Sequence, residues 1–307
     1  MIEITQKQLD AKGVYIDDKY KTNSGYVFND DVHIFCDIIF SASVCVEGNQ
    51  TTEGGVLVEG DETIKGCQTI EGNQTIEGDQ RIEGDQTIEG DQSVRKAQFV
   101  KGEQRIEGDQ TIEGCQSIKC HQFVEGNQVV EGNQVVEGDQ SVRKAQRVGG
   151  NQFVEGDQFV KGHQFVKGHQ FIKETQVVTG DQIVTRTQTI EGDQRIEGVQ
   201  DVNMEQSVEG DQLVKGSQIV RGNQTVRGYP VYKIVGMKHI GSRNNLTQIL
   251  YTKHDGIIIR CGCFLGTIDE FKRRVKQEHK DNIYYHEYMA LITYTRTMYP
   301  KYKELAK

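Results

Sequence analysis

The clearest candidates for chemistry are two cysteines, Cys261 and Cys263, separated by one glycine. Two thiols at this spacing can bind a metal ion or react as a redox pair, but a zinc site uses about four ligands at regular spacing. The further ligands would have to be His239, His254 or His279. Residues two apart in a strand point to the same face, so two packed core thiols also explain the motif. We predict structural thiols, with no metal and no cofactor.

A strict repeat must position most of the remaining residues. Glutamine recurs at every sixth position from Gln68 to Gln224 without a miss, and the same frame covers 31 hexads over residues 44–229. Short-period self-similarity of this kind indicates a solenoid. Position three, counted from the glutamine, is Ile or Val in every hexad except that of Thr52, which is typical of a strand residue facing a core. We predict a mainly β fold, a single-stranded parallel β-helix of about ten three-sided coils.

The other hexad positions follow from alternation along the strand. Position one should also face inward, where stacked glutamines could form amide ladders; an exposed glutamine that caps the turn is the alternative. Position five is glycine in 25 hexads, and we expect it to supply a positive φ at a corner, with Asp or Asn at position six tolerating the same turn. The aliphatic residue at every sixth position is similar to the repeat of left-handed β-helix proteins. Right-handed β-helices show the same alternation of inward and outward side chains, so the sequence does not predict the hand of the helix.

The chain divides into three predicted regions. Residues 1–43 carry strand signals that run directly into the first hexad and are expected to form an N-terminal cap. Residues 44–229 are the β-helix. Residues 230–307 lack the repeat and predict a small β-β-β-α-α domain.

Local signals place the elements of this last domain. Its turns are expected at residues 241–245 and at Asp255-Gly256. A capping box from Thr267 to Glu270 starts the first helix, and a second helix runs from Asp281 or Asn282 to Tyr299.

Charge and composition indicate an acidic rod with a basic end. The chain carries a formal net charge of −9, whereas residues 230–307 hold 14 basic and 7 acidic residues. No apolar stretch approaches the ~18 residues that span a bilayer, and the N-terminus lacks the pattern of a signal peptide. Seven cysteines without framework-like spacing are typical of reduced thiols. We expect a cytoplasmic protein that does not associate with membranes.

Both ends of the chain resemble a known group of proteins. The stretch KHIGSRNN, followed by GIIIRCGCFLGTIDEF, is similar to a small domain of phage and prophage proteins from Gram-positive bacteria. The lead-in before a short-period array also resembles phage-encoded hexapeptide-repeat accessory proteins. The resemblance covers roughly residues 1–60 and 230–298, and it implies a phage or prophage origin but no reaction, so the expected cytoplasm is that of a bacterial host. It assigns no role to any residue.

Position two carries the candidate binding surface. This position faces outward and turns apolar over consecutive hexads, and large exposed apolar patches mark interfaces. Ladders that only stabilise the rod are the alternative. The residues of this predicted belt are Phe123, Phe153, Phe159, Phe165, Phe171, Val177 and Ile183. A second candidate contact is the basic stretch of the predicted helix, with Lys272, Arg273, Arg274 and Lys276. An ordinary solvated helix face also explains these charges, so we do not expect nucleic acid as a partner.

These patterns lead to a functional hypothesis without catalysis. We expect an interaction protein that binds and inhibits or titrates a host protein, such as a component of a defence system. The alternative is a structural or small-ligand-sequestering homo-oligomer, a dimer or a trimer. A hexapeptide-type acyltransferase is disfavoured, because the array has no loop insertion and His163 and His169 fall on different sides of the coil.

Overall fold

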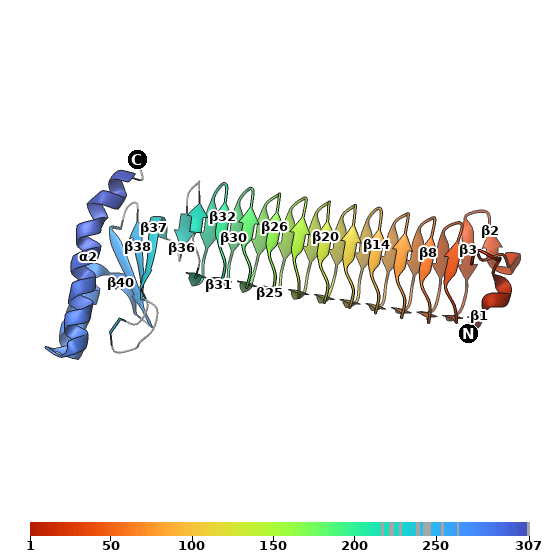
Figure 1. Cartoon of the computed structure of the whole chain (residues 1–307), viewed down its shortest axis with the longest axis horizontal. Coiled ribbons are helices and arrows are strands. Elements are labelled where there is room, and N and C mark those ends of the chain that lie inside the picture. The colour runs from red at the N-terminus through yellow and green to blue at the C-terminus, as the bar shows by residue number, and fades with distance from the viewer. Residues whose placement is uncertain are drawn as a thin grey trace. The chain divides into compact units, whose positions relative to one another are not determined.

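The computed structural model describes residues 1–215, 218–220, 224–226, 229–237, 240–241, 247–252, 255–262 and 264–305. The chain forms two compact units, Met1–Arg221 and Gly222–Lys307. Figure 1 shows the first unit as a stack of coils from red to green, and the second as a small sheet with helices in blue.

The first unit is a parallel β-solenoid with three strands in each coil. From β6 (Val44–Val46) to β35 (Gln218–Val220) every strand covers positions one to three of one hexad. Each strand pairs in parallel with the strand 18 residues further on, as β10 (Gln68–Ile70) does with β13 (Gln86–Ile88). The predicted mainly β, three-sided parallel β-helix is confirmed.

The strands form three sheets along the solenoid. The first sheet has 12 strands, from β1 (Ile2–Ile4) to β34 (Gln212–Val214), and the second has 11, from β5 (Ile38–Phe40) to β35. The third sheet begins at β3 (Gly25–Phe28) and continues through every third strand to β33 (Gln206–Val208). We call the outer surfaces of these sheets face one, face two and face three.

Positions one and three both point inward, as alternation predicts. Ile70, Ile88 and their equivalents at position three are fully buried. The position-one glutamines of the array up to Gln212 are no more than 2% exposed. A solenoid interior that is half apolar and half amide needs every amide group to find a partner, because an unpaired buried amide costs about 1–3 kcal/mol.

The glutamines find these partners in ladders, which confirms the prediction. Gln128 Nε2 donates to Gln110 Oε1 in the preceding coil at 2.8 Å, and Gln128 Oε1 accepts from Gln146 Nε2 at 2.8 Å. The three ladders are also joined to one another. Gln128 Nε2 lies 3.2 Å from Gln116 Oε1, whose strand belongs to a neighbouring sheet. The amides thus form one connected network in which every donor points toward the N-terminal end.

The parallel stacking begins before the hexads. Strand β1 pairs with β4 (Val32–Ile34), which pairs with β7 (Gln50–Thr52), so residues 1–43 contribute strands to the solenoid as well as a lead-in. The lead-in contains two 3-10 turns, η1 (Gln6–Gln8) and η2 (Asp18–Tyr20), and the short strand β2 (Lys21–Thr22). An aromatic cluster closes this end of the core, with ring centroids 5.2–6.1 Å apart, and comprises Tyr15, Tyr26, Phe28 and Phe40.

The expected role of glycine at position five is wrong. No described glycine of the hexads has a positive φ. A Cβ on Gly132 would instead lie 2.5 Å from the carbonyl oxygen of Gly114 in the preceding coil, so glycine allows a close approach between coils. At Lys96 and Lys144 the corresponding backbone bond is 3.3 Å long, compared with 2.9–3.2 Å at the hexad glycines.

Position six also serves a purpose other than the expected turn conformation. Asp91 Oδ1 accepts the backbone N–H of Asp109 in the next coil at 2.7 Å, and Asp109 Oδ1 accepts that of Asn127 at 2.7 Å. Lys280 is the described non-glycine residue with a positive φ, and it lies outside the hexads. Asp and Asn are therefore frequent because their side chains satisfy backbone donors at the corners.

The second unit is an antiparallel sheet with two helices. Its strands are β36 (Gln224–Val226), β37 (Tyr229–Met237), β38 (Thr247–Thr252), β39 (Ile257–Cys261) and β40 (Phe264–Thr267), followed by α1 (Ile268–His279) and α2 (Ile283–Leu305). The predicted Asp-Gly turn is confirmed by Gly256, whose φ is +78°. The capping box is confirmed too, because Thr267 and Glu270 exchange hydrogen bonds of 2.8 and 3.3 Å.

Three features of this unit differ from the prediction, and the first is that β36, expected in the β-helix, belongs to this unit and pairs antiparallel with β37. Residues 264–267 form strand β40, which pairs with β39 across a turn where Gly262 has a φ of +61°. Helix α2 continues beyond Tyr299 through Pro300 to Leu305. Tyr299 and Tyr302 pack their rings at 6.4 and 5.0 Å from that of Tyr251, which holds the last turns against the sheet. Of the predicted turn at 241–245, residues 242–245 lie outside the described part of the chain.

Candidate interaction surface

The solenoid distributes the predicted belt over all three faces. Strand pairing places Phe159 beside Val177 on face one, Phe165 beside Ile183 on face two, and Phe153 beside Phe171 on face three. Phe123 lies on face one, two coils before Phe159, with Ser141 between them. The belt therefore consists of three separate pairs and the isolated Phe123, and the exposure of each depends on its own neighbours.

The three pairs are not equally available to a partner. Phe153 and Phe171 stack on each other with centroids 5.0 Å apart and an interplanar angle of 6°, so each ring covers part of the other. The guanidinium groups of Arg105 and Arg143 lie 5.0 and 5.6 Å from the ring centroid of Phe123. Phe159 and Ile183 are the most open members of the belt, each 40% exposed. The available apolar surface is therefore concentrated on faces one and two.

Face two is also hollowed. A groove of about 640 Å³ follows the position-two residues of the second sheet and the turn that leads into them. Val129, Phe165 and Ile183 supply its apolar wall. Arg147 and His163 line it as well, and the small side chain of Ala145 leaves room between Asn127 and His163 at the turn. The volume of this groove lies within the size range of ligand-binding clefts, but the groove is open to solvent along its length.

The net charge of the rod changes sign in the coils that carry this groove. Residues 44–139 hold 20 acidic and 7 basic residues, whereas residues 140–187 hold 4 acidic and 7 basic residues. Among residues 44–215, five cations form no ion pair or side-chain hydrogen bond: Lys101, Lys144, Lys161, Lys167 and Arg186. Four of these five lie within residues 140–187. We call residues 140–187 the cationic segment.

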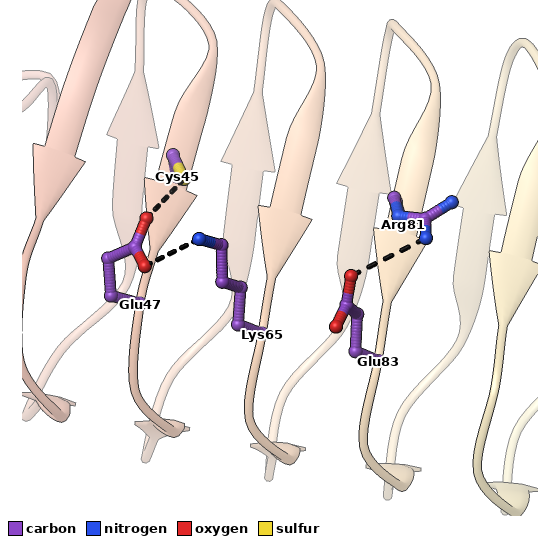
Figure 2. A network of polar contacts seen from close by, with 5 residues as sticks. All are labelled: Cys45, Glu47, Lys65, Arg81 and Glu83. Carbon is purple, nitrogen blue, oxygen red and sulfur yellow. Dashed lines mark hydrogen bonds and ion pairs between the residues drawn. The ribbon is translucent and has the colours of Figure 1, made fainter.

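Cations elsewhere on the rod are mostly neutralised by glutamates on the same face. Figure 2 shows an example on face three, where Lys65 Nζ lies 2.6 Å from Glu47 and Arg81 lies 3.4 Å from Glu83. Such exposed pairs contribute ~0–1 kcal/mol each, but they leave little net charge for a partner. Cys45 lies 3.9 Å from Glu47 in the same view, and burial followed by this carboxylate raises the pKa of its thiol, which disfavours the reactive thiolate.

One titratable group lies inside the glutamine network. Glu62 occupies position one of its hexad and is 1% exposed. It accepts hydrogen bonds from the side chains of Gln68, Gln74 and Gln80 at 2.9, 2.7 and 2.8 Å. Burial raises the pKa of Glu62 to about 7, against the effect of the three donors. A carboxyl group suits this place because the amide donors all point toward it.

Among the described thiols and histidines, one group of side chains comes close to a metal site. The ligand atoms of Glu103, Cys120 and His121 lie within 4.8 Å of one another. His121 Nδ1 already accepts the backbone N–H of Asp139 at 2.9 Å, and three donors are fewer than a structural zinc site uses. His163 and His169 are exposed at separate corners, as predicted.

The cysteine motif of the second unit is only partly described. Cys261 is 8% exposed, and its sulfur lies 3.4 Å from Thr247 Oγ1 and 3.5 Å from Tyr288 Oη, so it packs as a core thiol. Cys263 lies outside the described residues, as do the candidate ligands His239 and His254.

The predicted basic contact lies on helix α1. Arg273, Arg274 and Lys276 are exposed, and Lys272 is half-buried. Arg274 is paired with Glu278 at 2.8 Å. Arg273 and Arg274 also line a shallow depression of about 420 Å³ with Phe264 and Glu270. The acidic groups beside these cations reduce the positive charge that nucleic acid would need.

No protein-family model, curated protein or solved structure matches the chain. Among the described residues, neither helix is apolar enough along its length to cross a lipid bilayer. The sequence pattern predicted the residues of the belt but not the cationic segment. A count of charges in successive coils would have revealed that segment.

Proposed function

We propose that this chain is a non-enzymatic interaction protein that binds a host protein of a bacterium and inhibits or titrates it. One observation carries the proposal. The two most open members of the belt, four of the five unpaired cations and most of the residues that line the groove occur at the cationic segment. Apolar anchors surrounded by charged residues are typical of protein interfaces.

The remaining features support a binding role without assigning the partner. The described coils from residue 44 to 215 keep the six-residue spacing without an inserted loop, so the rod presents a rigid surface. The resemblance of both chain ends to phage accessory proteins favours a host factor, such as a defence component, in the cytoplasm of a bacterium. Preorganised surfaces bind tightly because little conformational entropy is lost.

A double substitution tests the proposal. Phe159→Asp with Phe165→Asp places two carboxylates on faces one and two without touching the core, and we expect it to abolish capture of a stoichiometric partner from bacterial lysate. Thr87→Asp with Thr111→Asp is the matched control, since these residues hold the same hexad position on the same faces outside the cationic segment. Capture that survives the phenylalanine changes, with circular dichroism unchanged, would refute the proposal.

The groove supports a second candidate function. Its volume of about 640 Å³ falls in the range of small-molecule sites, and Arg147 and His163 could contact an anionic group. A homo-oligomer that sequesters a small ligand would use this groove. Mass spectrometry of small molecules released from the purified protein on denaturation tests this candidate, which predicts a stoichiometric compound that Arg147→Ala removes.

A further inference from the structure

Face two is bordered by two columns of position-four side chains. The leading border belongs to the first-sheet hexads, directly before the turn into the second sheet. The trailing border belongs to the second-sheet hexads themselves. Glu71 and Glu89 on the leading border, and Glu113 on the trailing border, are exposed and form no ion pair or side-chain hydrogen bond among the described residues. The acidic half of this face therefore carries uncompensated negative charge on both borders.

Both borders change sign in the cationic segment. Lys161 follows on the leading border and Lys167 on the trailing border, and both are exposed and unpaired among the described residues. Lys144 adds a further unpaired cation at the turn beside the leading border. Each border of face two is therefore acidic along one half of the solenoid and cationic along the other.

Side-chain size along the centre of face two changes at the same level. Position two is small at Thr75, Ser93 and Thr111, and it is large at Phe165 and Ile183. Bulky residues can pack into a surface whose central residues are small. The acidic half therefore complements the cationic half both in charge and in shape.

We propose that face two is covered by face two of a second copy of this chain, with the two solenoids antiparallel. A two-fold axis across the rods brings leading border to leading border, so that the cationic half of each copy meets the acidic half of the other. Lys161 and Glu89 are 72 residues apart, which is four coils, or ~19 Å at the strand spacing. A parallel pair at the same level would instead place Lys161 near Lys167, which like-charge repulsion disfavours.

This inference rests on the proposed function, because it uses the same surface. Self-association and binding of a host protein therefore compete for that surface. In the free protein the second copy shields Phe165 and Ile183 from water. A host partner would then bind by displacing that copy. The competition separates the two ideas experimentally, because self-association needs no other protein.

Charge exchange between two variants tests the antiparallel pair. One variant carries Lys161→Glu and the other carries Glu89→Lys, and the two-fold axis brings these two positions together twice. Each variant alone places like charges at both contacts, so we expect sedimentation equilibrium at low salt to show monomers. An equimolar mixture restores opposite charges at both contacts and should form a heterodimer. The wild-type dimer should dissociate as salt is raised, since exposed charges are screened.

The matched control is Lys101→Glu, which changes net charge at an exposed, unpaired cation on face three and should leave the dimer intact. Circular dichroism of each variant verifies folding; if either variant unfolds, Lys161→Gln or Glu89→Gln replaces it and should weaken the dimer. A wild-type monomer at every concentration and salt, or a mixture that stays monomeric, overturns the inference. If the wild-type protein is a monomer and Phe159→Asp with Phe165→Asp abolishes partner capture, the proposed function is supported and the dimer is refuted.

Discussion

Replacing Glu62 by glutamine should change how stability depends on pH. In the native chain this carboxyl group is buried and has a pKa of about 7, compared with 4.5 for an unperturbed glutamate. The folded state therefore binds the proton more tightly than the unfolded state does. The contribution of Glu62 to stability is fully present below pH 4.5 and is lost as pH rises toward 7.

The size of the effect follows from this difference in pKa. A pKa that rises from 4.5 to about 7 corresponds to about 3 kcal/mol of stability lost across that range. A neutral amide at position 62 removes the loss, although it offers one oxygen in place of two to the donors of Gln68, Gln74 and Gln80. The variant can therefore be less stable than the native chain at pH 4.5 and still lose less stability as pH rises.

Urea unfolding at several pH values, followed by circular dichroism, measures this slope. The native chain should lose about 3 kcal/mol more than Glu62→Gln does between pH 4.5 and pH 7.5. Glu71→Gln, at an exposed position, is the control and should keep the native slope. Carbon-13 NMR should show one carboxyl titrating near pH 7 that is missing in Glu62→Gln. Equal slopes, or a carboxyl of Glu62 that titrates near pH 4.5, would refute the reasoning.

Three further changes test other parts of the structure. Gln128→Leu leaves one amide hydrogen on each of Gln140 and Gln146 without its acceptor, so urea unfolding should show a loss of about 2–5 kcal/mol. Gly132→Ala places a methyl group against the carbonyl of Gly114, and the same assay should show a loss of about 1–3 kcal/mol; an unchanged midpoint would contradict the close-approach explanation. Thr267→Ala removes the cap of α1 and should cost the second unit about 1 kcal/mol in thermal melts, which Thr267→Ser should largely restore.

The period of the sequence was sufficient to predict the coil and the direction of its side chains. A β-branched residue at position three and an invariant glutamine at position one fix two inward columns, because side chains alternate along a strand. The cross-links between ladders were beyond this reasoning. Whether Gln128 also reaches Gln116 depends on the width of the interior, which neither composition nor period states.

Glycine at position five shows where the sequence was ambiguous. Positive φ and close approach of two backbones both favour glycine. The two explanations are distinguished only by the φ angle and by the distance to the neighbouring coil in the structure. Lys96 and Lys144 already indicated that the position tolerates a side chain, which a strict requirement for positive φ would disfavour. At the belt, strand pairing decided which phenylalanines are open, since neighbours 18 residues apart either stack on a ring, as at Phe153, or leave it exposed, as at Phe159.

Photo-crosslinking from position 159 tests the central claim, that the cationic segment is an interaction surface, most directly. A photoreactive phenylalanine analogue at position 159 replaces a ring that is 40% exposed. The same analogue at position 99, where Arg81 covers the ring at 4.7 Å, serves as the comparison. We predict host-protein adducts in cells from position 159 and none from 99, while the same analogue at position 165, on face two, should crosslink to a second copy in purified protein. An absence of adducts from position 159 in cells and from position 165 in purified protein would contradict the account.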